Sequence, residues 1–136
     1  MVRLENKFKP EKTKIGILGG TFDPAHKGHL EISRQAKKRF NLKNIIWAIT
    51  KQNPFKDKSK SNLKSRMQFA KRLTGKNNYI KIKFYEEKIG SNRTIDLIKH
   101  LTKEKKSEIY FIMGADNLIN FHKWYKWKSI VKKCNI

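Results

Sequence analysis

The chain has 136 residues, of which 33 are Lys or Arg and 11 are Asp or Glu, giving a formal net charge of +22. This length suits one domain with a hydrophobic core, and the lack of a run of about 18 apolar residues argues against a membrane-spanning helix. The polar N-terminus predicts no secretory signal, and the single cysteine, Cys134, excludes an internal disulfide and leads us to expect a cytoplasmic protein.

In chain order, residues 1–13 are polar and aperiodic, which predicts a flexible tail before one domain over residues 14–136. Short apolar runs predict buried strands in this domain, and apolar residues at near-helical spacing predict amphipathic helices. The expected elements are a strand 14–20, a helix 28–40, a strand 44–50, a helix from Ser61 or Asn62 to about Leu73, a strand 79–86, a helix 94–101 capped by Thr94, a strand 108–114, and helices 115–124 and 126–134.

Two of these segments carry more detailed expectations. The run "YIKIKFYE" (79–86) alternates apolar and polar residues, which predicts a strand near the edge of the sheet, followed by a loop. In the segment 115–124 we expect one helix with Leu118, Phe121 and Trp124 on the same side.

Strands and helices alternate four times, which predicts an α/β fold with a doubly wound parallel sheet. In such sheets ligands bind beyond the carboxyl ends of the strands. Four polar or glycine-rich segments follow the four predicted strands: "GGTFDPAHKGH", "KQNPFK", "GSNRT" and "GADN". We therefore expect these segments to meet at one crevice.

The first of these segments, residues 19–29, fits neither the Walker loop nor the dinucleotide fingerprint. Its glycines allow the backbone to approach a ligand closely. His26 and His29 are three residues apart at the expected start of a helix, where unpaired N–H groups favour an anion. Two imidazoles there would form an electrophilic clamp for phosphate oxygens.

Two other readings of this segment stay open. A pair of histidines could bind zinc, although no further Cys, His or acidic residue stands at metal-ligand spacing. Alternatively the glycines form an ordinary turn and both histidines are solvent-exposed.

The high charge also has two interpretations, a polyanionic partner or compositional bias. Lysine supplies 27 of the 33 basic residues, and these lysines are scattered along the chain. This distribution is typical of an AT-rich genome, so we favour compositional bias over nucleic-acid binding.

"GGTFDPAHKGH" resembles the H-x-G-H signature of the nucleotidyltransferase superfamily. The segment "MGADNLINFHKWYKW" (113–127) is similar to the G-x-D…F…W-Y segment of bacterial nicotinate-nucleotide adenylyltransferases, and the resemblance extends over residues 14–136. A pantetheine-phosphate adenylyltransferase would share the first segment only. The resemblance implies a Rossmann-like fold and transfer of the adenylyl group from ATP, with Mg²⁺, to nicotinate mononucleotide.

The resemblance also implies roles for individual residues. His26 and His29 would be catalytic and would hold the ATP phosphates. The other residues expected at ATP are Gly19, Gly20, Thr21, Phe22, Gly114 and Asp116. Those expected at the nicotinate nucleotide are Asp23, Lys56, Arg66, Thr94, Trp124 and Tyr125.

Four of these residues have a plain structural alternative. Asp23 could cap its own turn and Thr94 could be a simple N-cap. Lys56 could be an ordinary solvated lysine, and Trp124 could be a core residue.

Members of this family normally continue through a further strand and helix that carry an S-x-x-x-R-like phosphate clamp. This segment is not found before Ile136, so we expect a C-terminally truncated domain, either a fragment or a naturally short chain with an exposed sheet edge. The alternatives that remain are an adenylyltransferase with another phosphate acceptor such as phosphopantetheine, an inactive truncated form, and a basic RNA-binding module. Oligomerisation is possible.

Overall fold

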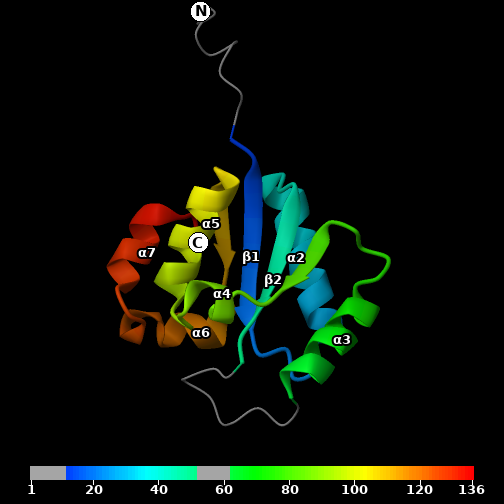
Figure 1. Cartoon of the computed structure of the whole chain (residues 1–136). Coiled ribbons are helices and arrows are strands. Elements are labelled where there is room, and N and C mark those ends of the chain that lie inside the picture. Colours follow the sequence, from blue (N-terminus) through cyan, green and yellow to red (C-terminus); the bar gives the residue numbers. More distant parts are fainter. Residues whose placement is uncertain (1–11, 52–61) are drawn as a thin grey trace, which may run out of the picture.

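Four strands of the computed structural model form one parallel sheet in the order β3-β2-β1-β4 (Figure 1). The structure describes residues 12–51 and 62–136. The strands are β1 (Lys14–Gly20), β2 (Asn44–Ile49), β3 (Ile80–Lys83) and β4 (Glu108–Ile112). This order confirms the predicted doubly wound sheet, and it places the glycine-ended strand β1 in the interior between β2 and β4.

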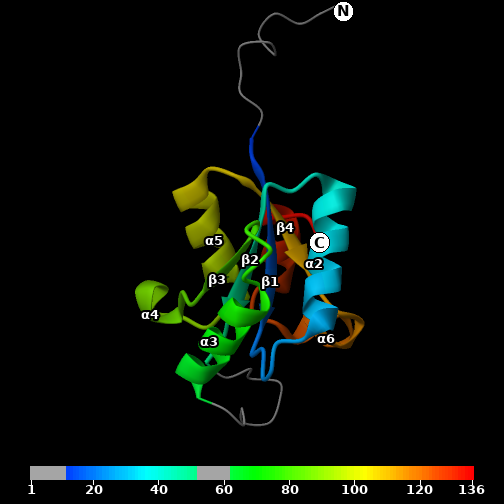
Figure 2. The same ribbon diagram turned by 90° about the vertical axis from the view of Figure 1, so that its right-hand side faces the viewer.

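Helices cover both faces of the sheet, as the view along its edge makes plain for α2 and α5 (Figure 2). They are α2 (Lys27–Phe40), α3 (Leu63–Leu73), α4 (Glu86–Ile89), α5 (Thr94–Lys105), α6 (Ala115–Ile119), the 3-10 helix η1 (Phe121–Lys123) and α7 (Trp127–Lys133). Within the described residues, no helix has the length and hydrophobicity needed to cross a membrane.

The two faces of β2 enter two separate hydrophobic clusters. Ile46 and Ala48 pack with α5 and α7, whereas Ile45, Trp47 and Ile49 pack with residues of α2 and α3. Because side chains alternate along a strand and both faces of this strand are covered, the sequence of β2 is apolar throughout.

The edge strand β3 is shorter than predicted. Ile80 is buried and Lys81 and Lys83 are exposed, which confirms the alternation and the edge position. The prediction that the strand extends to residue 86 was wrong, because Tyr85 turns into the core and is only 8% exposed. The helix α4 then occupies part of the expected loop and ends at Gly90, whose φ of 67° favours glycine.

The helix α5 begins where predicted but is longer, because its buried face continues through Leu101 into another helical turn. The prediction that Thr94 is the N-cap was wrong by one residue. Arg93 is the N-cap, and no side chain forms a capping hydrogen bond there.

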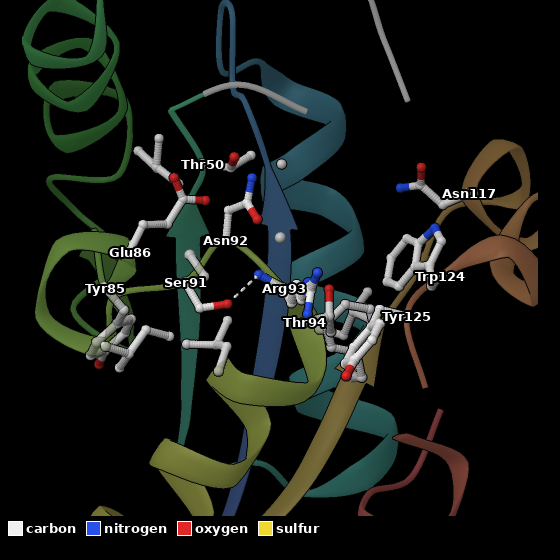
Figure 3. Close-up of a pocket in the computed structure, with 18 of the residues that line it drawn as sticks. Thr50, Tyr85, Glu86, Ser91, Asn92, Arg93, Thr94, Asn117, Trp124 and Tyr125 are labelled. Atoms are coloured by element: carbon white, nitrogen blue, oxygen red, sulfur yellow. Dashed lines mark hydrogen bonds between the residues drawn. The ribbon is translucent and has the colours of Figure 1, made fainter. Parts of the chain in front are cut away.

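The prediction of one helix over 115–124 was also wrong. The helix α6 ends at Ile119 and η1 follows after a break at Asn120. Phe121 is buried against the core but Leu118 is 60% exposed, so these residues do not share one buried side. The break turns the following Trp124 and Tyr125 toward the carboxyl ends of the strands (Figure 3).

Beyond α7, the backbone of Asn135 lies parallel to β4. Its N–H donates to the carbonyl of Ile109 at 2.9 Å, and its carbonyl accepts from the N–H of Phe111 at 2.6 Å. These bonds give β4 a neighbour on the side away from β1.

Candidate active site

A cavity of about 330 Å³ opens at the carboxyl ends of β1, β2 and β4. Its wall consists of the last residues of these strands, parts of α4, the loop 91–93 with Thr94, and the segment from Asn117 to Tyr125. The close-up shows Trp124 and Tyr125 on one side of this space and Thr50, Glu86 and Asn92 on the other (Figure 3). The expectation that four segments meet at one crevice is confirmed for those after β1, β3 and β4, which supply Gly19 and Gly20, residues 91–94, and Asn117, whereas "KQNPFK" lies almost entirely outside the described residues.

Gly19 and Gly20 line this cavity, and the protein itself leaves room for a larger residue at Gly19. A Cβ on Gly19 would lie 4.0 Å from its nearest neighbours, the carbonyl of Ala48 and the ring of Phe111. By contrast, a Cβ on Gly16 would lie 2.9 Å from Leu42 Cδ1. A Cβ at Gly16 would therefore force buried side chains to shift, whereas a Cβ at Gly19 meets only ordinary contacts at the cavity.

His26 and His29 cap the N-terminus of α2 reciprocally. The N–H of Gly28 donates to His26 Nδ1, and the N–H of His26 donates to His29 Nδ1, both at 3.0 Å. The two rings lie 4.0 Å apart between centroids. Because each Nδ1 accepts a backbone N–H, the proton of a neutral imidazole must be on Nε2. The exposed ring of His26 therefore presents its Nε2–H beside a helix N-terminus, where an anion is favoured.

The ring of His29 belongs to a cluster of three aromatic rings. Its centroid lies 4.6 Å from that of Phe22 and 5.7 Å from that of Trp47, and the Phe22 ring stacks nearly parallel on the indole at 4.9 Å. Phe22 has a φ of 51°, which is unusual for a bulky residue, and it is 2% exposed. The packing of the Phe22 side chain against Trp47 stabilises this backbone conformation.

A buried hydrogen-bond chain supports the same histidine. Trp47 Nε1 donates to Ser33 Oγ at 2.9 Å, and Ser33 Oγ donates to the carbonyl of His29 at 2.7 Å. Trp47 and Ser33 are both fully buried. The middle of β2 therefore anchors the first turn of α2, although the sequence pattern indicated only a core tryptophan there.

The two histidines are absent from the wall of the cavity, which lies on the face of the sheet covered by α5. Thr21 and Phe22 belong to the turn that leads from Gly20 at the cavity to α2. Asp23 is partly buried in that turn, and its peptide bond to Pro24 is cis. The turn after β1 thus joins the cavity to the histidine pair.

Arg66, which we expected at the nicotinate nucleotide, is buried between the segments that follow β1 and β2. Its side chain is 3% exposed, and Nη1 donates to the carbonyls of Thr21 and Thr50 at 2.8 and 2.7 Å. Nη2 donates to the carbonyl of Lys51 at 2.8 Å. The guanidinium therefore ties the segments after β1 and β2 together, because five N–H groups on a rigid plane can serve several carbonyls at once.

Thr94, Trp124 and Tyr125 line the cavity as predicted. Trp124 also packs edge-on against Phe111 and Phe121, with centroids 5.9 and 5.3 Å apart. The tryptophan thus belongs both to the core and to the cavity wall.

Three further predicted residues are not among the described lining residues. Gly114 is the N-cap of α6 at the end of β4 and does not line the cavity. Asp116 belongs to α6, but its side chain lies outside the described part of the structure, and Lys56 lies outside the described residues altogether.

Several lining residues were missed by the sequence reasoning, among them Glu86, Arg93 and Lys123. Arg93 lies over the ring of Tyr125, with 3.9 Å between its guanidinium carbon and the ring centroid. Its signal in the sequence was its place in "GSNRT", one of the segments expected at the crevice, although no role was assigned to it. Tyr85 also lines the cavity, and burial raises the pKa of its hydroxyl, which therefore stays a protonated donor. Among the described residues, no group of three or more His, Cys, Asp or Glu is placed to hold a metal ion.

Comparison with known proteins places these features in a family. Residues 17–136 match the family described as Cytidylyltransferase-like. The probable nicotinate-nucleotide adenylyltransferase of Pelagibacter ubique (strain HTCC1062) is 76% identical over all 136 residues, which cover 76% of that protein. The corresponding protein of Ruegeria sp. (strain TM1040) is 34% identical over 119 residues, 87% of this chain and 62% of the relative.

Solved structures share the fold. A putative nicotinate-nucleotide adenylyltransferase from Vibrio parahaemolyticus superposes with a TM-score of 0.74 at 18% identity, covering 90% of this chain and 74% of that one. The Plasmodium falciparum nicotinic acid mononucleotide adenylyltransferase complexed with NaAD gives a TM-score of 0.74 at 21% identity, covering 88% and 60%. The chain spans about three quarters of the Pelagibacter relative and less than two thirds of the Ruegeria one.

Proposed function

The chain belongs to the cytidylyltransferase-like family and, within it, to the nicotinate-nucleotide adenylyltransferases, and we propose that it transfers the adenylyl group of ATP to nicotinate mononucleotide. A phosphate oxygen of the mononucleotide attacks the α-phosphorus of ATP, the bond to the β-phosphate breaks, and pyrophosphate leaves. The product is the nicotinate dinucleotide, deamido-NAD, and this step belongs to NAD biosynthesis.

One observation carries this proposal. A cavity with an aromatic wall opens at Gly19 and Gly20, the last residues of β1. The turn that follows β1 leads directly to His26 and His29, which cap α2 reciprocally. The cavity offers a place for the pyridine nucleotide, and the histidine pair at the N-terminus of α2 offers a place for the phosphates of ATP. This reaction needs no covalent intermediate, so alignment of the reacting groups and stabilisation of growing negative charge provide most of the rate.

The cavity wall suits a pyridine ring that carries a carboxylate. Trp124 provides a flat apolar surface for stacking, and Thr94 begins α5, whose N-terminus favours a negative charge. The Plasmodium enzyme was solved with NaAD, and a further structure of it with APC, so structures of the same fold hold nucleotide ligands.

In this proposal Mg²⁺ arrives as part of the ATP substrate, where it neutralises phosphate oxygens. Asp116, Lys56 and Gly114 remain predicted contacts of the nucleotides. A cytoplasmic location and assembly into oligomers also stay predictions.

The test is to incubate the purified chain with ATP, Mg²⁺ and nicotinate mononucleotide and to measure pyrophosphate and the dinucleotide. We expect both products in equal amounts. The absence of product from a folded chain would overturn the proposal for this chain. A parallel reaction with phosphopantetheine as the acceptor tests the alternative substrate. Activity with phosphopantetheine but not with nicotinate mononucleotide would assign the chain to the alternative reaction.

A further inference from the structure

Arg93 provides a positive charge at the aromatic side of the cavity. It is the N-cap residue of α5 and lines the cavity next to Thr94. Its guanidinium carbon lies 3.9 Å from the ring centroid of Tyr125, and the close-up shows Arg93, Thr94 and Tyr125 together (Figure 3). The family resemblance assigned roles to Thr94 and Tyr125 but none to Arg93.

The backbone of Arg93 is held on both sides, which fixes the origin of its side chain. Its N–H donates to Ser91 Oγ at 3.1 Å, and that hydroxyl donates to Asp96 Oδ2 at 2.6 Å. The carbonyl of Arg93 accepts from the N–H groups of Asp96 and Leu97 at 3.1 and 3.2 Å. The loop and the first turn of α5 therefore deliver the guanidinium to Tyr125 with little freedom of the main chain.

The hydrogen bonds of Arg93 within the described residues are made by its backbone, so its N–H fork has no acceptor there. A guanidinium can contact an aromatic ring through its flat face while its N–H groups bind another partner in the plane. No carboxylate of the described residues forms an ion pair with Arg93. The acidic residue of the cavity wall, Glu86, accepts the N–H of Lys51 at 3.0 Å. The planar fork of Arg93 is thus suited to a carboxylate supplied by a ligand.

Building on the proposed function, we propose that Arg93 binds the ring carboxylate of nicotinate mononucleotide and makes the enzyme prefer this acid to the corresponding amide, nicotinamide mononucleotide. The carboxylate belongs here because Arg93 and Tyr125, which are in contact, line the same cavity as Trp124, the aromatic side chain that would stack on the pyridine ring. The reacting phosphate must instead reach the turn that leads to His26 and His29. An amide would turn a neutral group toward the cation and would lose the paired, charge-assisted hydrogen bonds.

The experiment compares the two mononucleotides as acceptors for wild type, Arg93→Gln and Arg93→Lys. For each protein, kcat/KM is measured with both acceptors, and equilibrium binding of both is measured by calorimetry without ATP. We expect Arg93→Gln to lower the preference for the acid by about tenfold, chiefly through KM for the acid, with little change for the amide. Arg93→Lys keeps the charge but not the planar fork, so its preference should be intermediate.

Lys126→Gln is the matched control. Lys126 Nζ also lies over the Tyr125 ring, at 5.4 Å, but this residue does not line the cavity. The variant removes the same charge beside the same ring, and we expect it to leave the preference unchanged. Equal thermal unfolding of the three variants and wild type would exclude misfolding as the cause.

The outcomes separate the inference from the proposed function. An equal loss with both mononucleotides in Arg93→Gln, or an unchanged preference, would overturn the role of Arg93. A wild-type chain that binds the acid selectively through Arg93 but forms no dinucleotide would overturn the proposed function while supporting the inference, because the binding ratio does not depend on turnover.

Discussion

Trp47 in the middle of β2 donates its indole N–H to Ser33 Oγ on α2 at 2.9 Å, although 14 residues separate the two in sequence. Both side chains are fully buried, and Ser33 Oγ in turn donates a hydrogen bond to the carbonyl of His29. The pair therefore couples the hydrophobic core to the first turn of the helix that carries both histidines.

Replacing Ser33 by Ala should destabilise the protein by about 1–3 kcal/mol, because the buried N–H of Trp47 loses its acceptor. The double variant Ser33→Ala with Trp47→Phe removes both polar partners, so its loss of stability should be smaller than the sum of the two single losses. Urea unfolding of the two single variants and the double variant measures the effect. Strict additivity of the two single losses would show that the pair is not coupled.

His26 combines a capping role with the proposed role at the phosphates, and Asn can separate the two. Asparagine is a good N-cap residue but has no Nε2, so His26→Asn should keep stability within about 1 kcal/mol. We expect its kcat to fall by about a hundredfold, the usual effect of losing one donor to a developing charge.

His26→Ala is the comparison for that variant, because it loses the cap as well and should be less stable by about 1 kcal/mol. Thermal unfolding and steady-state kinetics measure both variants. Full activity of His26→Asn would remove His26 from the proposed mechanism.

Arg66→Met should lower the free energy of unfolding by about 3 kcal/mol, because three backbone carbonyls lose the donors that reach them from one buried side chain. The activity of any folded fraction should also fall, since Arg66 holds the turn at Thr21. Arg72→Met, an exposed arginine on the same helix, is the control and should change stability by less than about 0.5 kcal/mol. Chemical denaturation provides the measurement.

Glycine substitutions in β1 should separate packing from ligand access. Gly16→Ala places a Cβ 2.9 Å from Leu42 Cδ1 and should destabilise the fold by about 1–3 kcal/mol. Gly19→Ala places a Cβ 4.0 Å from its nearest neighbours, so the free energy of unfolding should stay unchanged while KM for the nucleotide substrates rises. Unfolding curves and kinetics on the same preparations test this contrast, and a Gly19→Ala protein with wild-type KM would contradict it.

The thiol of Cys134 should react slowly at neutral pH. Burial raises its pKa from 9.0 to about 11, and only the thiolate is nucleophilic. The rate of labelling by a disulfide reagent should therefore rise as the pH approaches 11 or when the protein unfolds. The pKa of the thiol is higher in the folded than in the unfolded chain. The thiol therefore stabilises the folded state below pH 9, and this stabilisation is lost as the pH rises toward 11. Fast labelling of the folded chain at pH 7 would contradict the burial.

Much of this molecule is specified by short-range patterns. The apolar run 44–50 predicts a buried strand, and the apolar spacing in 28–40 predicts a helix, because both periods are properties of neighbouring residues. The spacing of His26 and His29 likewise predicts that they share the start of a helix. The bounds of α4, α5 and α6 were less predictable, since side chains such as Tyr85 and Leu118 were buried or exposed by the surrounding fold.

The sequence alone thus determined the parallel α/β architecture, the glycine-ended β1 and the histidine pair, because strand and helix periods and local capping depend on residues within a turn of each other. Tertiary structure alone decided that Arg66 reaches the carbonyl of Thr21 across 45 residues, and that Arg93 lies on Tyr125. These partners are set by which strands lie side by side and by where the chain breaks after α6. The spacing of residues along the chain predicts neither the order of the strands nor the position of this break.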